Sequence, residues 1–294
     1  MIKELLLLLL LLTGFIALNG QSYFNLNGTI KDSLGVGVSY STLVITSSGR
    51  GYYSDVDGGF EIPNISLGDT LLIQAIGYDN YILPVISKDS VKIKLVQTSY
   101  ELSEINVSGS NDVSSSKVVL GNFSKRSKGE MRGSPGLTIV TKVDNRYGQN
   151  GYIVSVKFWA DFLRKCDGLI RIRAYAVSPN GSPGQEITRD NSIIMLKGSR
   201  KVHEIDISEQ FIELPKGGAF IGIEFVKQKE GCRVDKLTGS RFVGIGYNYD
   251  SNGYKTYISR LAKKWSIFTS PFSNERGGEA NLNLNATVKF IHSN

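Results

Sequence analysis

Strict alternation of apolar and polar residues near the end of the chain is the feature that most constrains its fold. Between Leu282 and Phe290 an apolar residue occupies every even position, with Leu284, Ala286 and Val288 completing the series. Successive side chains of a strand point to opposite faces, whereas a helix repeats its apolar face every three to four residues. The segment therefore predicts a strand with one buried and one solvated face.

The composition extends this β prediction to the whole chain. Its 294 residues include 32 glycines, 14 tyrosines and 13 phenylalanines, which favour strands and turns. The length allows one large or two modest domains. Further strands are predicted over residues 153–160, 169–177, 202–207 and 219–226. We expect an all-β protein.

The first 20 residues have the features of a signal peptide. Lys3 precedes an apolar run from Leu5 to Leu18, and Gly20 before Gln21 suits cleavage. The run is shorter than the roughly 20 residues of a membrane-spanning helix, although an uncleaved anchor is the alternative. We expect export to the periplasm, the outer-membrane surface or the medium, with no transmembrane segment after cleavage.

Charge and composition divide the remaining chain. Residues 21–106 carry five basic and nine acidic residues, a net charge of −4, whereas residues 107–294 carry 28 basic and 17 acidic residues, a net charge of +11. Eight serines and five glycines lie within 107–136, which predicts a Ser/Gly/Lys-rich linker. A basic second module could attract anionic polysaccharide or lipid, or simply be a solvated surface. Nucleic acid is not an expected partner.

The first module, residues 21–106, shows short β segments separated by turns. Leu43–Thr46 predicts a strand, and Asp57-Gly58-Gly59 predicts a hairpin turn. Residues 91–95 alternate strictly between apolar and lysine residues. These patterns predict a sandwich of about seven short strands.

Four spaced elements of this module carry a family resemblance. Residues 28–32 (GTIKD), 54–62 (SDVDGGFEI), 67–71 (LGDTL) and 76–78 (IGY) occur in the order found in the carboxypeptidase regulatory-like domain, which the module resembles. The resemblance implies a transthyretin-like or Ig-like β-sandwich that serves bacterial envelope proteins as an accessory module without catalytic residues. The chain departs from the family at residues 34–38, where a proline is usual.

The second module, residues 137–294, is predicted to be a jelly-roll-like β-sandwich of about eight strands. Its segments RIRAY at 171–175, NGSPG at 180–184 and IGIEF at 221–225 are similar to an uncharacterised β-sandwich region that follows such domains in envelope proteins. That resemblance implies no activity.

Cys166 and Cys232 are the only cysteines, and both fall in the second module. In an exported chain the even number favours a disulfide, which would stabilise the fold by about 3 to 5 kcal/mol. Two separate thiols are the alternative, because sequence does not place the two side chains in space.

Enzyme motifs are absent from the sequence. With only His203 and His292, no histidine-based metal site is expected, and no nucleophile elbow or phosphate-binding loop occurs. We expect neither a metal nor another cofactor. A glycosidase needs only two carboxylates, which leaves Asp161, Asp206, Glu213 and Glu224 as alternatives, and Glu224 stands out between two apolar strand residues.

Aromatic residues gather in one segment of the second module. Their flat rings suit stacking on sugars, and the predicted ligand platform comprises Tyr247, Tyr249, Tyr254, Tyr257 and Trp265. Cross-strand aromatic packing is the alternative. Residues 258–268 fit either a short helix or two strands around Lys263 and Lys264.

Together these patterns favour an exported, non-enzymatic envelope protein that binds a glycan or an outer-membrane protein. A carbohydrate-active hydrolase using paired carboxylates is the alternative, and a purely structural spacer is the third hypothesis.

Overall fold

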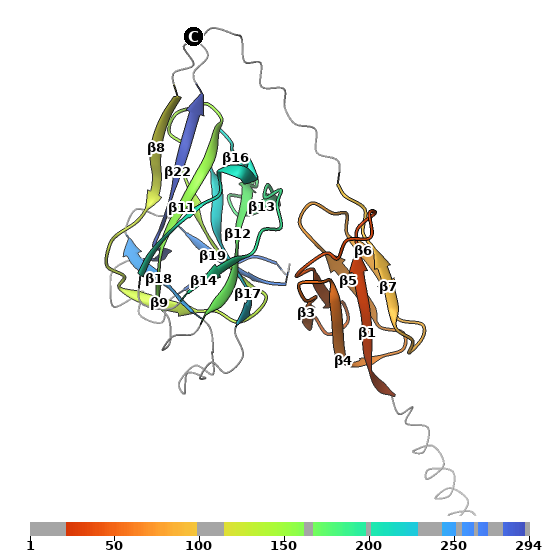
Figure 1. Ribbon diagram of the computed structural model, residues 1–294. Coiled ribbons are helices and arrows are strands. Elements are labelled where there is room, and N and C mark those ends of the chain that lie inside the picture. Colours follow the sequence, from red (N-terminus) through yellow and green to blue (C-terminus); the bar gives the residue numbers. More distant parts are fainter. Residues whose placement is uncertain are drawn as a thin grey trace, which may run out of the picture.

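The chain forms two β-sandwiches, which confirms the all-β prediction (Figure 1). The computed structural model describes residues 22–98, 115–161, 167–197, 201–228, 243–250, 255–261, 264–269 and 279–291. Within these ranges the only helical element is a short 3₁₀ turn, η1 (Ser208–Gln210). The described part of the chain contains no helix with the length and hydropathy of a membrane-spanning segment.

The smaller sandwich has the seven strands that the sequence predicts. They are β1 (Tyr23–Lys31), β2 (Thr42–Ile45), β3 (Gly51–Tyr53), β4 (Gly59–Ser66), β5 (Thr70–Gln74), β6 (Tyr81–Pro84) and β7 (Val91–Lys94). One sheet has the order β4-β1-β7 and the other the order β3-β2-β5-β6. β7 runs parallel to β1, whereas the other neighbouring strands are antiparallel.

The core of the smaller sandwich follows from alternation along these strands. On β1, Leu26 and Ile30 are buried while Asn25 and Lys31 are exposed. Leu43 on β2 adds to the same core from the other sheet. Each sheet thus contributes one apolar face, as expected for a sandwich.

The turn around Asp57 differs from the predicted hairpin. β3 pairs with β2, whereas β4 pairs with β1, so the turn crosses from one sheet to the other. Asp55 Oδ1 accepts hydrogen bonds from the backbone N–H groups of Asp57 and Gly59 at 2.9 and 2.7 Å. Gly58 has a φ of +79°, which glycine adopts without strain.

The larger sandwich contains fifteen strands in the described residues, more than the eight that the sequence predicts, because several are short edge strands. One sheet has the order β13-β12-β17-β10-β19-β20, with β14 also paired to β12. Its strands are β10 (Leu137–Val143), β12 (Gly168–Val177), β13 (Pro183–Glu186), β14 (Ile194–Leu196), β17 (Ala219–Gln228), β19 (Thr256–Arg260) and β20 (Ser266–Ile267).

The second sheet of the larger sandwich has the order β21-β18-β11-β22-β8, with β15 and β16 paired to β11 and β9 paired to β18. Its strands are β8 (Ser115–Asn122), β9 (Gly129–Arg132), β11 (Gly151–Asp161), β15 (Lys201–Asp206), β16 (Glu213–Leu214), β18 (Gly244–Asp250), β21 (Glu279–Leu282) and β22 (Leu284–Ile291). For residues 258–268 the two-strand alternative is correct, because β19 pairs with β20.

The predicted linker over 107–136 is wrong from Ser115 onward, where strands β8 and β9 lie. β8 pairs with β22 along eight residue pairs, and β9 pairs with β18. Leu120 on β8 lies in the core of the larger sandwich, so an apolar anchor outweighs the serine-rich composition around it. Residues 107–114 lie outside the described ranges, as do the predicted signal peptide, Cys166 and Cys232.

The alternating C-terminal segment differs in one detail from the single strand that the sequence predicts. All five even-numbered apolar residues from Leu282 to Phe290 are buried, as predicted. The segment nevertheless forms two strands, because Asn283 interrupts it between β21 and β22. The side chain of Asn283 is fully buried and bonds the backbone N–H and C=O of Ser124 at 2.7 and 2.8 Å. A polar residue here joins the sandwich to the segment between β8 and β9.

Strands β12 and β17 carry the feature that positions the functional site. Ile170 and Ile172 on β12, with Ile223 and Phe225 on β17, point into the core of the larger sandwich. The intervening side chains point to the opposite face of the same sheet. This outer face is the one that contacts the smaller sandwich.

Candidate functional site: a polar cavity between the two sandwiches

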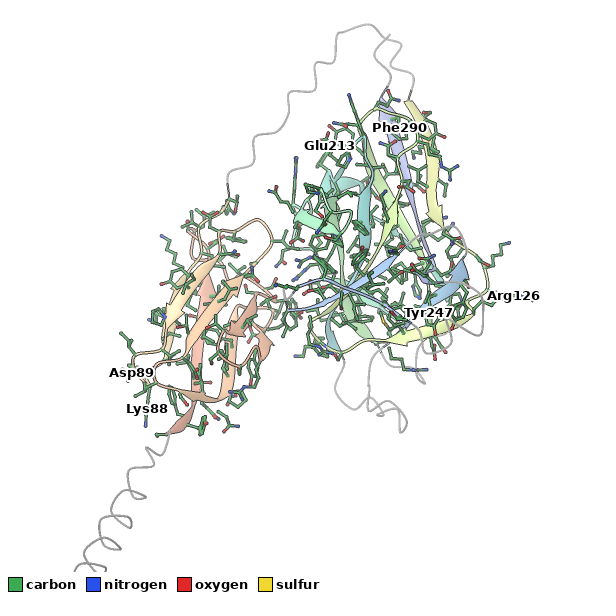
Figure 2. All side chains as sticks on the ribbon, turned by 180° about the vertical axis from the view of Figure 1, so that it is seen from behind. Lys88, Asp89, Arg126, Glu213, Tyr247 and Phe290 are labelled. Carbon is green, nitrogen blue, oxygen red and sulfur yellow. The ribbon has the colours of Figure 1, made fainter. Side chains whose placement is uncertain are left out.

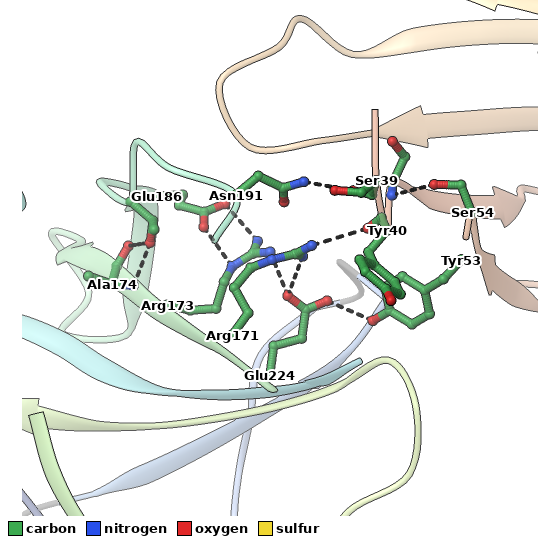
Figure 3. A network of polar contacts seen from close by, with 12 residues as sticks. Ser39, Tyr40, Tyr53, Ser54, Arg171, Arg173, Ala174, Glu186, Asn191 and Glu224 are labelled. Carbon is green, nitrogen blue, oxygen red and sulfur yellow. Dashed lines mark hydrogen bonds and ion pairs between the residues drawn. The ribbon is translucent and has the colours of Figure 1, made fainter. Parts of the chain in front are cut away.

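Hydrogen bonds between described residues join the smaller sandwich to the outer face of the larger one (Figure 3). The Tyr53 hydroxyl donates to Glu224 Oε1 at 2.6 Å, and Arg171 Nη2 donates to the Tyr40 carbonyl at 3.1 Å. Asn191 Nδ2 donates to the Ser39 carbonyl at 2.8 Å. Residues 39–53 of the smaller sandwich therefore contact strands β12 and β17 and the segment between β13 and β14, which holds Asn191.

An apolar contact accompanies these bonds. Gly51 on β3 lies against Leu261, which follows β19, so closely that a Cβ atom at Gly51 would approach Leu261 Cδ1 to 2.0 Å. A larger residue at this position would force the Leu261 side chain of the other module to shift.

Two arginines and two glutamates form an ion-pair network at this interface. Glu224 Oε2 lies 2.9 Å from Arg171 Nη1 and 2.8 Å from Arg173 Nη1. Arg173 also pairs with Glu186, with its Nε 2.6 Å and its Nη2 2.7 Å from the two carboxylate oxygens. Arg171 and Glu224 are buried, so each charge is stabilised by its partner rather than by hydration.

These surroundings shift the pKa values of the two carboxyl groups in opposite directions. Burial opposes ionisation of Glu224, but the guanidinium groups of Arg171 and Arg173 and the Tyr53 hydrogen bond outweigh it and lower its pKa to about 2. Burial raises the pKa of Glu186, an effect that Arg173 offsets only in part. Burial, followed by the negative charge of Glu224, raises the pKa of Tyr53 well above its ordinary value.

A cavity of about 280 Å³ lies beside this network, with walls from both sandwiches. Its lining from the smaller sandwich includes Thr42, Gln74, Gly77, Tyr78 and Asn80. Its lining from the larger sandwich includes Thr138, Arg171, Arg173, Tyr175, Glu186, Thr188, Glu224, Ser259, Leu261 and Trp265. Arg171 Nε is buried and has no hydrogen-bond acceptor among the described residues. The cavity is therefore lined mainly by polar side chains.

Aromatic residues form one side of the cavity. Trp265 packs edge-on against Tyr175, with ring centroids 4.9 Å apart. Both belong to a small apolar cluster on the outer face of the sheet, with Val140, Phe220 and Tyr257. Convergent polar groups beside an aromatic wall are typical of small-molecule sites.

The structure divides the predicted aromatic platform between two locations. Tyr247 and Tyr249 lie on β18, where their rings meet edge to face at 5.6 Å, and Tyr247 also packs against Phe268. Figure 2 shows Tyr247 in the larger sandwich, toward the side remote from the smaller one. Tyr247 is 7% exposed, which matches the alternative of aromatic packing.

The other platform residues lie on the opposite sheet. Tyr257 packs edge to face on Phe220 at 5.3 Å, and Trp265 lines the cavity. Tyr254 lies outside the described residues. Trp265 is thus the member of the predicted platform that lines the cavity.

The four candidate carboxylates do not converge. Glu224 lies in the cavity wall on β17, whereas Asp161, Asp206 and Glu213 belong to strands of the other sheet. Asp206 and Glu213 instead make local contacts, with Ser208 and Asn150 respectively.

Asp161 forms a carboxyl pair that the sequence does not predict. It lies beside Glu130, whose pKa is raised first by burial and then by the interaction with the Asp161 carboxyl group. Arg132 pairs with Glu130 from the same strand, β9. This second cluster lies on the sheet that does not contact the smaller sandwich.

His203 takes a structural position. Its ring stacks on Phe158 with centroids 5.7 Å apart, on neighbouring strands β15 and β11. His292 lies outside the described residues. Within the described ranges no group of three or more His, Cys, Asp or Glu side chains is placed to hold a metal ion.

Sequence reasoning identified Glu224 but missed its partners. The alternation of Arg171 and Arg173 with isoleucines predicts a strand with a charged face, without indicating that a second module covers that face. Tyr53 and Glu186 lie 171 and 38 positions from Glu224, and no local pattern links them to it. The one available signal is that Arg171 and Arg173 on β12 and Glu224 on β17 are charged residues that alternate with apolar core residues.

Comparisons with known proteins do not place the chain in a family. No family model matches the chain, and no curated protein matches it. The cysteine protease and lectin-like domains of Cwp84, a surface layer associated protein of Clostridium difficile, share 11% identity at a TM-score of 0.35. That match covers 86% of this chain and 58% of that one, so the chain spans less than two thirds of the matched structure.

Two structures from Bacteroides are also similar. A candidate carbohydrate-binding protein from Bacteroides uniformis shares 9% identity at a TM-score of 0.22, over 91% of this chain and 98% of that one. A candidate membrane-associated protein of unknown function from Bacteroides fragilis shares 11% identity at a TM-score of 0.21, over 79% of this chain and 99% of that one. These TM-scores are too low to establish a shared fold.

Proposed function

We propose that this chain is an exported, non-enzymatic protein of the cell envelope that binds a glycan in the cavity between its two sandwiches. The observation that carries the proposal is the lining of that cavity. Trp265 and Tyr175 supply aromatic surface, and Arg171, Gln74 and Asn80 supply polar groups. A volume of about 280 Å³ lies near the lower end of the roughly 300–1,000 Å³ of ligand pockets and suits one sugar ring.

The position of Arg173 supports binding rather than hydrolysis. A glycosidase places two carboxyl groups on either side of the bond that it cleaves, about 5 to 10 Å apart. Here Arg173 lies between Glu186 and Glu224 and bonds both, so its guanidinium occupies the space that a glycosidic bond would need. The Glu224 carboxylate is also held by Arg171 and Tyr53.

A binding assay with a matched tryptophan pair tests the proposal. Glycan arrays and calorimetry on the two-module protein should detect a ligand, and Trp265→Ala should weaken its binding at least tenfold. Trp159→Ala is the control, because Trp159 lies on β11 in the other sheet. Equal effects of the two substitutions, or no binding by any envelope glycan, would contradict the proposal.

A carbohydrate-active hydrolase is the second candidate, favoured by one observation. The pKa of Glu186 is raised and that of Glu224 is lowered, and such opposed shifts are found in acid and nucleophile pairs. Release of reducing sugar from envelope polysaccharides, abolished by Glu224→Gln, would favour this candidate over binding alone. If activity appears but survives that substitution, Glu224 has no catalytic role.

A further inference from the structure

The charge at the cavity is balanced, although the chain as a whole is basic. Residues 107–294 carry a net charge of +11, which by itself suggests an anionic ligand. At the cavity, however, the positive charges of Arg171 and Arg173 face the negative charges of Glu186 and Glu224. The residues of the smaller sandwich that line the cavity, which are Thr42, residues 74–78 and Asn80, are uncharged.

The guanidinium groups of the cavity have little capacity left for a ligand carboxylate. Every side-chain nitrogen of Arg173 already has an acceptor, on Glu186, Glu224 or the Tyr175 hydroxyl. Arg171 gives Nη1 to Glu224 and Nη2 to the Tyr40 carbonyl, so only its Nε lacks an acceptor. Arginine recognises a carboxylate through two parallel N–H groups, and in both arginines Nη1 and Nη2 already donate to acceptors of the protein.

The rest of the polar lining suits hydroxyl groups. Gln74 and Asn80 are amides that bond each other at 3.1 Å, and Thr138 and Ser259 carry hydroxyls. Amides and hydroxyls both donate and accept, as sugar hydroxyls do. A carboxylate at this place would lose its hydration beside a network without net charge, whose arginines already pair with Glu186 and Glu224.

We infer that the cavity selects an uncharged saccharide over the corresponding uronic acid. This inference rests on the proposed function, because it names the ligand class of the same site. Glu186 is its specificity-determining residue, since its Oε2 accepts a hydrogen bond from Arg173 Nη2 and its negative charge offsets that of Arg173.

Matched sugar pairs test the inference on the two-module protein. Calorimetry at neutral pH compares galactose with galacturonic acid and glucose with glucuronic acid, which differ only in the oxidation of C6. We expect the neutral member of at least one pair to bind about tenfold or more tightly than its acid. Tighter binding of either acid would overturn the inference while leaving glycan binding intact.

A charge-matched pair of variants tests the role of Glu186. Glu186→Gln removes the negative charge that offsets Arg173 and should shift the preference at least tenfold toward the acid. Glu213→Gln removes the same charge on the other sheet, where Glu213 contacts Asn150, and should leave the preference unchanged. An unchanged preference in Glu186→Gln, or equal shifts in both variants, would overturn the assignment. If no sugar of either class binds, the proposed function itself fails, and the inference fails with it.

Discussion

The two faces of the sheet formed by β12, β17 and β10 are buried in different ways. On the inner face, Ile172, Ile223 and Phe225 contact the apolar face of the second sheet. On the outer face, Arg171 and Glu224 are covered by the smaller sandwich and by each other. The same strands therefore provide a core on one side and a polar interface on the other.

The comparison shows that burial has different energetic consequences on the two faces. An apolar side chain gains stability when it leaves water, at about 25 cal/mol per Å². A charged side chain loses hydration, which only a well-placed partner offsets. On the inner face, the stability lost on truncating a side chain should therefore depend on the volume that is removed. On the outer face, it should depend on whether the substitution leaves a buried charge without a partner.

The largest effect is expected on the inner face. Phe225→Ala removes a fully buried ring and leaves a cavity, so the free energy of unfolding should fall by about 3 to 5 kcal/mol. Denaturant unfolding measures this loss. Val119→Ala, at a 59%-exposed position on β8, is the control and should change stability little. If both variants lost a similar amount of unfolding free energy, burial of the Phe225 ring would not explain its effect.

On the outer face, removal of one charge should be almost as damaging. Arg171→Met leaves Glu224 buried without its main partner, and about 3 kcal/mol of the unfolding free energy should be lost. The double variant Arg171→Met with Glu224→Gln removes both charges and should recover part of that loss. If the double variant is as unstable as the sum of the two single variants, the charges are not coupled.

Sequence patterns predicted the inner face much better than the outer one. Alternation along residues 169–177 and 219–226 predicts which side chains point inward, because the period of a strand is two. The same alternation places Arg171, Arg173 and Glu224 on the other face and says nothing about what covers it. That depends on residues 39–53, which are more than 100 positions away.

The predictions of the linker and of the aromatic platform failed in part for the same reason, because a sequence pattern does not show which distant segments pair. β8 has a serine-rich sequence, yet it pairs with β22 about 170 positions later. Tyr247 and Trp265 are close in sequence, yet strand pairing assigns them to opposite sheets. Composition identifies which residues could bind a sugar, and only the pairing of strands shows which of them meet.

Acid should weaken the outer face by way of Glu224. An unfolded glutamate has a pKa of about 4.3, whereas the folded pKa is about 2. The stabilisation is therefore fully present above about pH 4.3 and is lost as the pH falls toward 2, by about 3 kcal/mol in all. For Glu186, whose pKa is raised, the sign is opposite, since its ionisation costs stability as the pH rises above its ordinary pKa.

Unfolding of the native protein and of Glu224→Gln between pH 5 and pH 2.5 measures this contribution. The difference in unfolding free energy between the two should shrink as the pH falls. A difference that stays constant over this range would mean that Glu224 has an ordinary pKa in the folded protein.

A smaller effect is expected from the hydrogen bond that joins the modules. Tyr53→Phe removes the donor to Glu224 Oε1 without changing the ring, and a bond to a charged group is worth about 1.5 to 3 kcal/mol. Thermal unfolding should show a lower midpoint. Tyr52→Phe is the control, because the Tyr52 side chain packs against the core of the smaller sandwich instead. Equal midpoints for the two variants would argue against the bond between the modules.

The smallest effect is expected from an ion pair on the second sheet of the larger sandwich. Lys157 Nζ lies 2.7 Å from Glu204 Oε2, as close as Arg173 lies to Glu186, but both side chains are at least one third exposed. Water and salt screen such a pair, and the long lysine side chain must be ordered to form it. Lys157→Met should therefore leave the unfolding midpoint within the reproducibility of the measurement, at low and at high salt. A loss comparable to that of Arg171→Met would show that distance, rather than burial by the second module, determines the strength of the charge pairs.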